Sequence, residues 1–248
     1  FLTLLVQVVN AEVLEEKFKQ KYGKEWNVEI NDNTNSMKRL IGYNIDIKNK
    51  KTEVKSLTVS NEDIIDSTLR DFIQNNSDFF DINAEDLEKG KIEYDKSHRK
   101  DFGSGNWYIY YEQKYKGILV YNSYLNFIII NDKIVSISNN FYPNINLSTS
   151  PYLSKEYAFN KVKEDTNYDS INLYNFSLFI YPDETKKPIA YHLAWYLLID
   201  DWKYFIDANS GEILYKETTL RDNTITGTVT GMVYIPNSKF SQRLVNIS

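Results

Sequence analysis

The sequence predicts an α+β fold of two antiparallel-sheet units, each packed against helices, followed by a tail of β character. Helical spacing of apolar residues is confined to short segments, whereas alternating apolar residues recur along most of the chain. A polar segment with two prolines, 143–151, separates two groups of predicted strands. Aromatic residues make up 15% of the chain and suit half-buried sheet surfaces.

The first unit begins with two predicted helices. Leu14, Phe18 and Tyr22 recur every four residues and predict a helix over 12–22. A capping-box-like start at Ser60 predicts a second helix, which ends at 75–77. Alternation predicts strands at 26–30, 40–47, 107–115, 121–129 and 134–141. The last three form an antiparallel meander, with turns at 116–117 and 131–132.

The second unit is predicted as one helix followed by an antiparallel sheet. Ser154 can cap a helix that runs through Val162, with Ala158 and Val162 facing inward. Turn sequences at 200–201 and 209–211 connect strands predicted at 176–181, 189–199, 202–207 and 212–216. From Leu220 the chain is rich in threonine and glycine, which is typical of a linker that leads into new β structure.

Composition excludes several classes of function. The net charge of −5 and the lack of a basic cluster argue against nucleic acid as a partner. The chain has no cysteine, so disulfides, thiol nucleophiles and thiolate metal sites are excluded. No segment after the N-terminus is apolar enough to predict a stable membrane anchor.

The N-terminus predicts export. The apolar run 1–9 ends in Val9-Asn10-Ala11, which fits the end of a signal peptide cleaved after Ala11. We therefore expect a secreted, extracellular protein. A buried N-terminal strand or helix is the alternative interpretation of the same run.

A search for catalytic groups predicts no catalytic, cofactor-binding or metal-binding residue. The only histidines are His98, in a charged segment, and His192, in a predicted strand, and no His-Glu-x-x-His sequence is present. Asp200 and Asp201 fit a hairpin turn better than a carboxylate pair. The segment 207–212 resembles a calcium loop only faintly, because it lacks the full ligand series and the flanking helices.

An aromatic run at 107–111 supplies a candidate partner face. Alternation places Tyr108 and Tyr110 on the side of the strand opposite Trp107, Ile109 and Tyr111. If the second group packs into the core, the two tyrosines are free to meet a partner. The alternative is a sheet covered on both sides within the same chain.

Two stretches resemble known modules. The segment 105–120 resembles the fungalysin/thermolysin propeptide motif, and 154–158, 190–195 and 204–214 resemble a PepSY domain. The motif residues are Trp107, Gln113, Tyr115, Gly117, Val120, Trp195, Asp207 and Gly211. The chain departs from the pattern at Asn139 or Asn140, where the family often has glycine.

This resemblance covers about residues 12–220 and implies four parts. They are a signal-peptide remnant (1–11), a propeptide-like domain (12–147), a PepSY-like domain with a cystatin-like fold (148–220), and a linker or the start of the mature region (221–248).

The resemblance implies the N-terminal prodomain of a secreted thermolysin- or fungalysin-like zinc metallopeptidase precursor. Such a region acts as an intramolecular chaperone and as an inhibitor until it is cleaved, here expected within 220–230. Its partner is its own downstream catalytic domain, where zinc and calcium would bind, and it carries no catalytic residue itself. A free-standing secreted inhibitor or regulator, or a cell-surface β-domain protein, are the alternatives.

Overall fold

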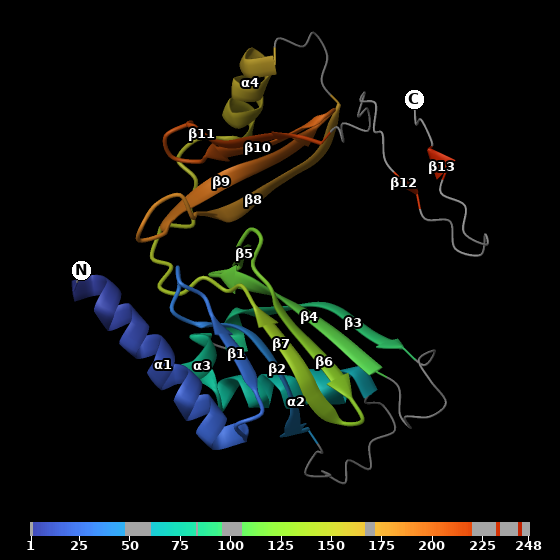
Figure 1. Ribbon diagram of the computed structural model, residues 1–248. Coiled ribbons are helices and arrows are strands. Elements are labelled where there is room, and N and C mark those ends of the chain that lie inside the picture. Colours follow the sequence, from blue (N-terminus) through green and yellow to red (C-terminus); the bar gives the residue numbers. More distant parts are fainter. Residues whose placement is uncertain are drawn as a thin grey trace.

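The computed structural model describes residues 2–47, 61–82, 84–95, 106–166, 172–219, 232–233 and 243–244. Figure 1 shows two units, a larger sheet with helices α1 to α3 and a smaller sheet with helix α4. Strand neighbours within each sheet are antiparallel. The predicted α+β class with two antiparallel sheets is therefore confirmed.

The larger sheet has the strand order β1-β2-β7-β6-β4-β3, and the short strand β5 pairs with β4. Its elements in chain order are α1 (Leu2–Tyr22), β1 (Asn27–Ile30), β2 (Met37–Asp46), α2 (Asn61–Gln74), α3 (Ser77–Phe80), the 3-10 helix η1 (Ala84–Asp86), β3 (Leu87–Asp95), β4 (Asn106–Tyr115), β5 (Ile118–Leu119), β6 (Leu125–Ile130) and β7 (Lys133–Asn139).

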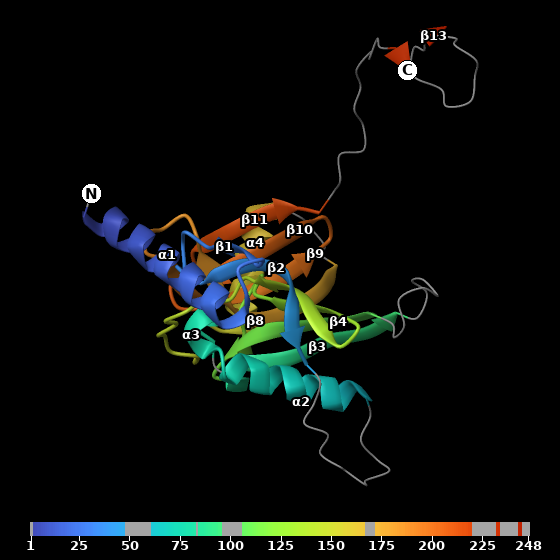
Figure 2. The same cartoon turned by 60° about the horizontal axis from the view of Figure 1, so that its bottom comes forward.

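One face of the larger sheet packs against the helices to form the main core. Leu69 and Ile73 of α2 are fully buried together with Ile109 and Phe127 of the sheet. Figures 1 and 2 show α2 lying along this face. Burial of each such side chain stabilises the fold by about 1.5–3 kcal/mol, so this face fixes the register of the strands.

The smaller sheet is a meander of order β11-β10-β9-β8, with α4 on one face. Its elements are α4 (Lys155–Thr166), β8 (Leu173–Asp183), β9 (Ala190–Ile199), β10 (Trp202–Asp207) and β11 (Ile213–Thr218). Ala158 and Val162 of α4 are fully buried against Leu197, Tyr204 and Ile206, as the helical spacing predicts. In the tail, β12 (Met232–Val233) pairs with β13 (Arg243–Leu244).

Helix α1 differs from its prediction. It begins at Leu2 rather than at Glu12, so the apolar run 2–9 is part of one continuous helix. Cleavage after Ala11 and export both stay predictions. Among the described residues, none of the helices has the length and apolar character needed to span a membrane.

The sequence prediction missed β3, α3 and the short elements η1 and β5 of the first unit. Strand β3 pairs with β4, but its alternation is broken by an irregularity between Lys89 and Ile92. The chain was expected to leave helical structure at 75–77, yet the single turn α3 follows at once. Phe79 and Phe80 of α3 are buried, so packing forms this turn where local propensity is weak.

The strand predicted over 121–129 was wrong at its start. Asn122 has a φ of 58°, and the Ser123 hydroxyl donates to the carbonyl of Val120 over 2.7 Å. These features form a turn, and β6 begins only at Leu125. Tyr121 is therefore not on the core face of β6 and contacts the second unit instead.

Candidate protein-interaction site

Gln113, a residue of the propeptide-like motif, hydrogen-bonds the backbone of the segment that follows β7. It lies near the end of β4 and is 7% exposed. Its Nε2 donates to the carbonyl of Tyr142 over 2.8 Å, and its Oε1 accepts the amide of Tyr142 over 2.9 Å. Its own carbonyl accepts the amide of Val120. The side chain of Gln113 thus fixes the segment at Tyr142, and its backbone carbonyl fixes the chain at Val120.

The motif residues after Gln113 form a hairpin that reaches the second unit. Lys116 and Gly117 have positive φ angles and turn the chain so that β5 pairs back onto β4. Val120 then makes a parallel bridge with Ile180 of β8, and the amide of Tyr121 donates to the carbonyl of Ile180 over 2.8 Å. The motif therefore builds the contact between the two sheets.

An apolar cluster fills this contact. Val120, Tyr142 and Ile180 are buried in it, and Tyr115 packs against them. Tyr191 of β9 donates its hydroxyl to the carbonyl of Pro143 over 2.7 Å. Burial raises the pKa of Tyr191 to about 12, and burial followed by the hydrogen bond to Glu184 raises the pKa of Tyr142. Both phenols are therefore neutral over the physiological pH range.

Three motif residues hold the loops of the second unit: Trp195 and Gly211, and Asp207 at the β10–β11 turn. The indole Nε1 of Trp195 donates to the carbonyl of Leu153 over 3.0 Å. Gly211 has a φ of 78°, a left-handed conformation that favours glycine, and a Cβ there would also displace the Tyr157 ring, whose Cε1 would lie 2.8 Å away. Trp107, a motif residue of the first unit, packs against the core of that unit.

Asp207 closes the turn between β10 and β11. Its Oδ1 accepts the amides of Asn209 and Ser210, each over 2.8 Å, and its Oδ2 lies 2.8 Å from Nδ1 of His192. Burial alone would raise the pKa of Asp207, but hydrogen bonds from Ser210, His192 and Asn209 outweigh it and lower that pKa. Both oxygens of Asp207 are thus hydrogen-bonded, one to the turn and the other to His192.

The histidine and acidic side chains of the described ranges form no metal-binding cluster. Within those ranges, no group of three or more His, Cys, Asp or Glu side chains is placed to hold a metal ion. His192 is a hydrogen-bonded sheet residue, as predicted, and Asp200 and Asp201 lie at the turn between β9 and β10. His98 lies outside the described residues.

Tyr108 and Tyr110 lie on the face of the larger sheet opposite the helices. Tyr108 is 38% exposed, and the ring of Tyr110 stacks on Tyr124 with centroids 6.5 Å apart. Gly90, on the neighbouring strand β3, leaves room for the ring of Tyr110 because it has no side chain. A Cβ there would lie only 2.6 Å from Cδ1 of Tyr110. Among the described residues the helices pack on the other face, and the partner role of the two tyrosines stays a prediction.

A shallow cavity of about 260 Å³ opens on this aromatic face. Within the described part of the chain, the side-chain oxygen of Asn126 is buried there without a hydrogen-bond partner. The lining residues are Lys91, Glu93, Tyr108, Ile109, Tyr110, Asn126, Phe127, Ile128, Ser136 and Ser138. The face thus combines aromatic surface with polar groups, the composition of many protein-contact surfaces.

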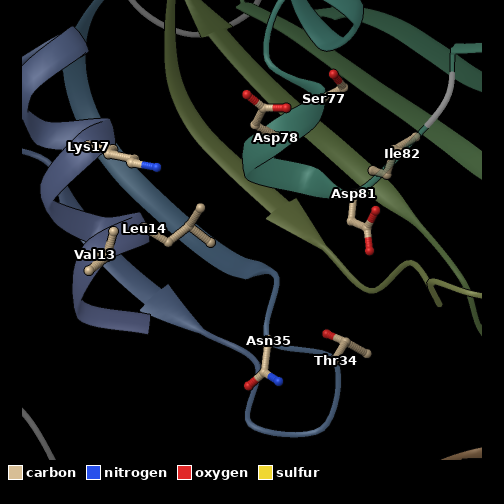
Figure 3. Close-up of a pocket in the computed structure, with 9 residues that line it drawn as sticks. All are labelled: Val13, Leu14, Lys17, Thr34, Asn35, Ser77, Asp78, Asp81 and Ile82. Carbon is tan, nitrogen blue, oxygen red and sulfur yellow. The ribbon is translucent and has the colours of Figure 1, made fainter. Parts of the chain in front are cut away.

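A second hollow, not predicted from the sequence, lies between α1, the β1–β2 turn and α3. Figure 3 shows Lys17 of α1 across from Asp78 and Asp81, with Thr34 and Asn35 at the turn below. Its volume is about 560 Å³. A neighbouring cavity of about 760 Å³ shares Thr34 and Asn35 and extends to the Pro143–Asn146 segment and the β8–β9 hairpin. The only sequence signal was the concentration of polar turn residues at 31–36.

Comparisons with known proteins assign no family. No family model matches the sequence, and no curated protein matches it. Among solved structures, the chain is similar to the Bacillus megaterium YpeB C-terminal domain, with 13% identity over 85% of this chain and 96% of that chain, at a TM-score of 0.35. A likeness of this size supports no inference about function, so the resemblance to the propeptide and PepSY modules rests on the sequence motifs alone.

Proposed function

We propose that the chain is the N-terminal prodomain of a secreted zinc metallopeptidase precursor, which assists the folding of the downstream protease and inhibits it. The observation that carries this proposal is the position of the propeptide-like motif residues in the structure. Gln113 holds the backbone of Tyr142, and Val120 pairs with Ile180 of the second unit, so this motif lies at the contact between the two units. A binding module needs such a rigid frame, because ordering loose parts on binding costs affinity.

The polar side chains of the motifs form hydrogen bonds to the backbone of the same chain. Gln113 satisfies the backbone of Tyr142, and Asp207 satisfies the turn that follows it. This use of side chains favours a protein that acts by contact over one that acts by bond cleavage.

Tethering explains how moderate affinity suffices in such a protein. A short linker gives a tethered partner an effective concentration on the order of millimolar. A partner that binds the native state also shifts folding toward that state by mass action. Cleavage within 220–230 would remove the tether and let the inhibitor dissociate; this segment lies outside the described residues.

The aromatic face is the contact surface that we assign to inhibition. Tyr108 and Tyr110 project from the uncovered face, and aromatic anchors commonly dominate the energy of protein contacts. We expect the chain to inhibit a matched zinc metallopeptidase when added in trans. The double variant Tyr108→Ala/Tyr110→Ala should raise the inhibition constant by about tenfold to a hundredfold.

The test is steady-state hydrolysis of a fluorogenic peptide by the protease at increasing inhibitor concentration. Tyr152→Ala, at a residue that is 84% exposed in the second unit, is the matched control and should inhibit as the unchanged chain does. Equal inhibition by the folded double variant would exclude this face. Failure of the unchanged chain to inhibit any such protease, or hydrolysis of peptide by the chain alone, would overturn the proposal as a whole.

A further inference from the structure

The two larger sheets end in four edge strands, and three of these carry features that discourage pairing with another chain. Strand β3 has an irregular register and carries Glu88, Lys89, Lys91 and Glu93. Strand β11 carries Lys216 and Glu217, and β1 has only four residues, one of them Glu29. Charge, irregularity and short length are the common protections of a sheet edge.

Strand β8 has one such feature, a register irregularity between Leu173 and Asn175 at its start, and beyond it lacks these protections over most of its length. It has 11 residues, and no Lys, Arg, Asp or Glu occurs before Asp183 at its end. Its first residues are open to solvent, with Leu173 44% exposed and Tyr174 66% exposed. Long, uncharged and exposed edges are the ones that accept an added strand.

The backbone of β8 presents unpaired groups on its outer side. The carbonyl of Ile180 points away from β9, because it accepts the amide of Tyr121. Residues two and four positions earlier share this direction, so Leu178 and Phe176 also turn their amide and carbonyl groups outward. No described backbone group pairs with either residue on that side.

The contact with Val120 limits what can bind there. Val120 already lies beside Ile180 as a parallel bridge, so that position on the edge is occupied by the chain itself. The free edge with regular pairing geometry therefore extends from Asn175 to Leu178. Its length fits a guest strand of about four residues, within the common range of strand lengths.

We propose that β8, from Asn175 to Leu178, binds an extended, uncharged segment of a partner polypeptide as an added strand. The outward groups of Phe176 and Leu178 supply the backbone hydrogen bonds, and the absence of charge selects an uncharged guest. A partner is favoured over a second copy, because each copy has a net charge of −5 and two copies repel each other. This site does not depend on the protease prodomain function.

The probe is a fluorescein-labelled, end-capped hexapeptide of alternating valine and threonine, added to the full chain. Fluorescence anisotropy should show saturable binding. A further peptide carries an N-methyl group on every residue. Neither of its edges can donate a backbone hydrogen bond to β8, so it should bind about tenfold or more weakly than the parent.

Amide hydrogen exchange locates the binding. Exchange at Phe176 and Leu178 should slow when the parent peptide is present, while exchange along β11 stays unchanged. The variant Tyr174→Lys places a charge on the edge and should weaken binding about fivefold or more, whereas the control Tyr152→Lys should not.

Four results would overturn the proposal. They are no saturable binding of the parent peptide, equal binding of the parent and the fully N-methylated peptide, protection on another edge, and protection of Phe176 and Leu178 by dimerisation of the chain without peptide. The peptide series keeps the test valid even if the Tyr174→Lys variant fails to fold.

Discussion

At the residue scale, a few amide and carboxylate side chains replace backbone pairing where the strands end. Asn139 is an example: it is 1% exposed, its Nδ2 donates to the carbonyl of Met37, and its Oδ1 accepts the amide of Phe141. The propeptide family often has glycine at this position or the next. The asparagine here stabilises the exit from β7 through side-chain hydrogen bonds, which glycine cannot make.

Gln113 offers the sharpest test at this scale. The variant Gln113→Leu keeps the approximate size of the side chain but leaves the amide and carbonyl of Tyr142 without their partner. Each unsatisfied buried group costs about 1–3 kcal/mol, so the free energy of unfolding should fall by about 2–4 kcal/mol. Urea denaturation followed by circular dichroism measures this loss.

Gln20 provides the matched control for that substitution. It is an exposed helix residue whose Nε2 contacts Glu16 over 3.2 Å. Gln20→Leu should change the free energy of unfolding by no more than about 0.5 kcal/mol. If Gln113→Leu lowers the free energy of unfolding by less than about 1 kcal/mol, water or backbone movement replaces the two hydrogen bonds to Tyr142.

At the element scale, the β10–β11 turn depends on an ionised carboxylate. The pKa of Asp207 is lowered in the folded state, because hydrogen bonds outweigh the effect of burial. A lowered folded pKa means that ionised Asp207 stabilises the fold above its unfolded pKa of about 4, and that this contribution is lost as the pH falls through the folded value. Acidification should therefore weaken this turn.

The variant Asp207→Asn tests this dependence. It should unfold at lower urea concentration than the unchanged chain at pH 7, and the difference between the two should shrink as the pH is lowered below about 4. Asp132→Asn, in the exposed β6–β7 turn, is the control and should show little difference at either pH. A difference that stays constant down to pH 2 would contradict a role for the ionised form.

Most elements follow from periodicity, and the exceptions have physical causes. Strand β10 and its neighbours were predicted because apolar alternation and turn residues agree there. Strand β3 was missed because charged residues and Gly90 interrupt its alternation, and its place is fixed by pairing with β4. Tyr121 was placed in a strand because its spacing fits β6, whereas the turn at Asn122 directs it to the second unit.

The candidate site was only partly predictable. Alternation correctly separates Tyr108 and Tyr110 from the core residues Ile109 and Tyr111. The β8 edge was not predicted, because strand order is a property of tertiary pairing and leaves no local signal in the sequence. The polar hollow beside α1 depends likewise on elements that are remote in sequence.

At the scale of the whole molecule, one aromatic ring joins the two units. Tyr121, from the turn after β5, lies against the face of the smaller sheet that α4 leaves free, with its centroid 4.4 Å from that of Phe205. Three further rings lie 6.2–6.5 Å away, those of Phe179, Tyr181 and Tyr196. This contact makes the hydrophobic interior of the second unit depend on a residue of the first.

We expect the two units to unfold together for this reason and to separate in the variant Tyr121→Ala. Removal of the ring takes away aromatic contacts worth about 0.5–1.5 kcal/mol per pair beyond the area they bury, and it exposes Phe205. Differential scanning calorimetry should show one transition for the unchanged chain and two, or one broadened and lowered transition, for the variant. Tyr152→Ala removes an exposed ring of the same kind and should leave the transition unchanged. If the Tyr121→Ala variant unfolds in one equally sharp transition at the same temperature, the hydrogen bonds of Gln113 and the Val120–Ile180 bridge couple the two units without this ring.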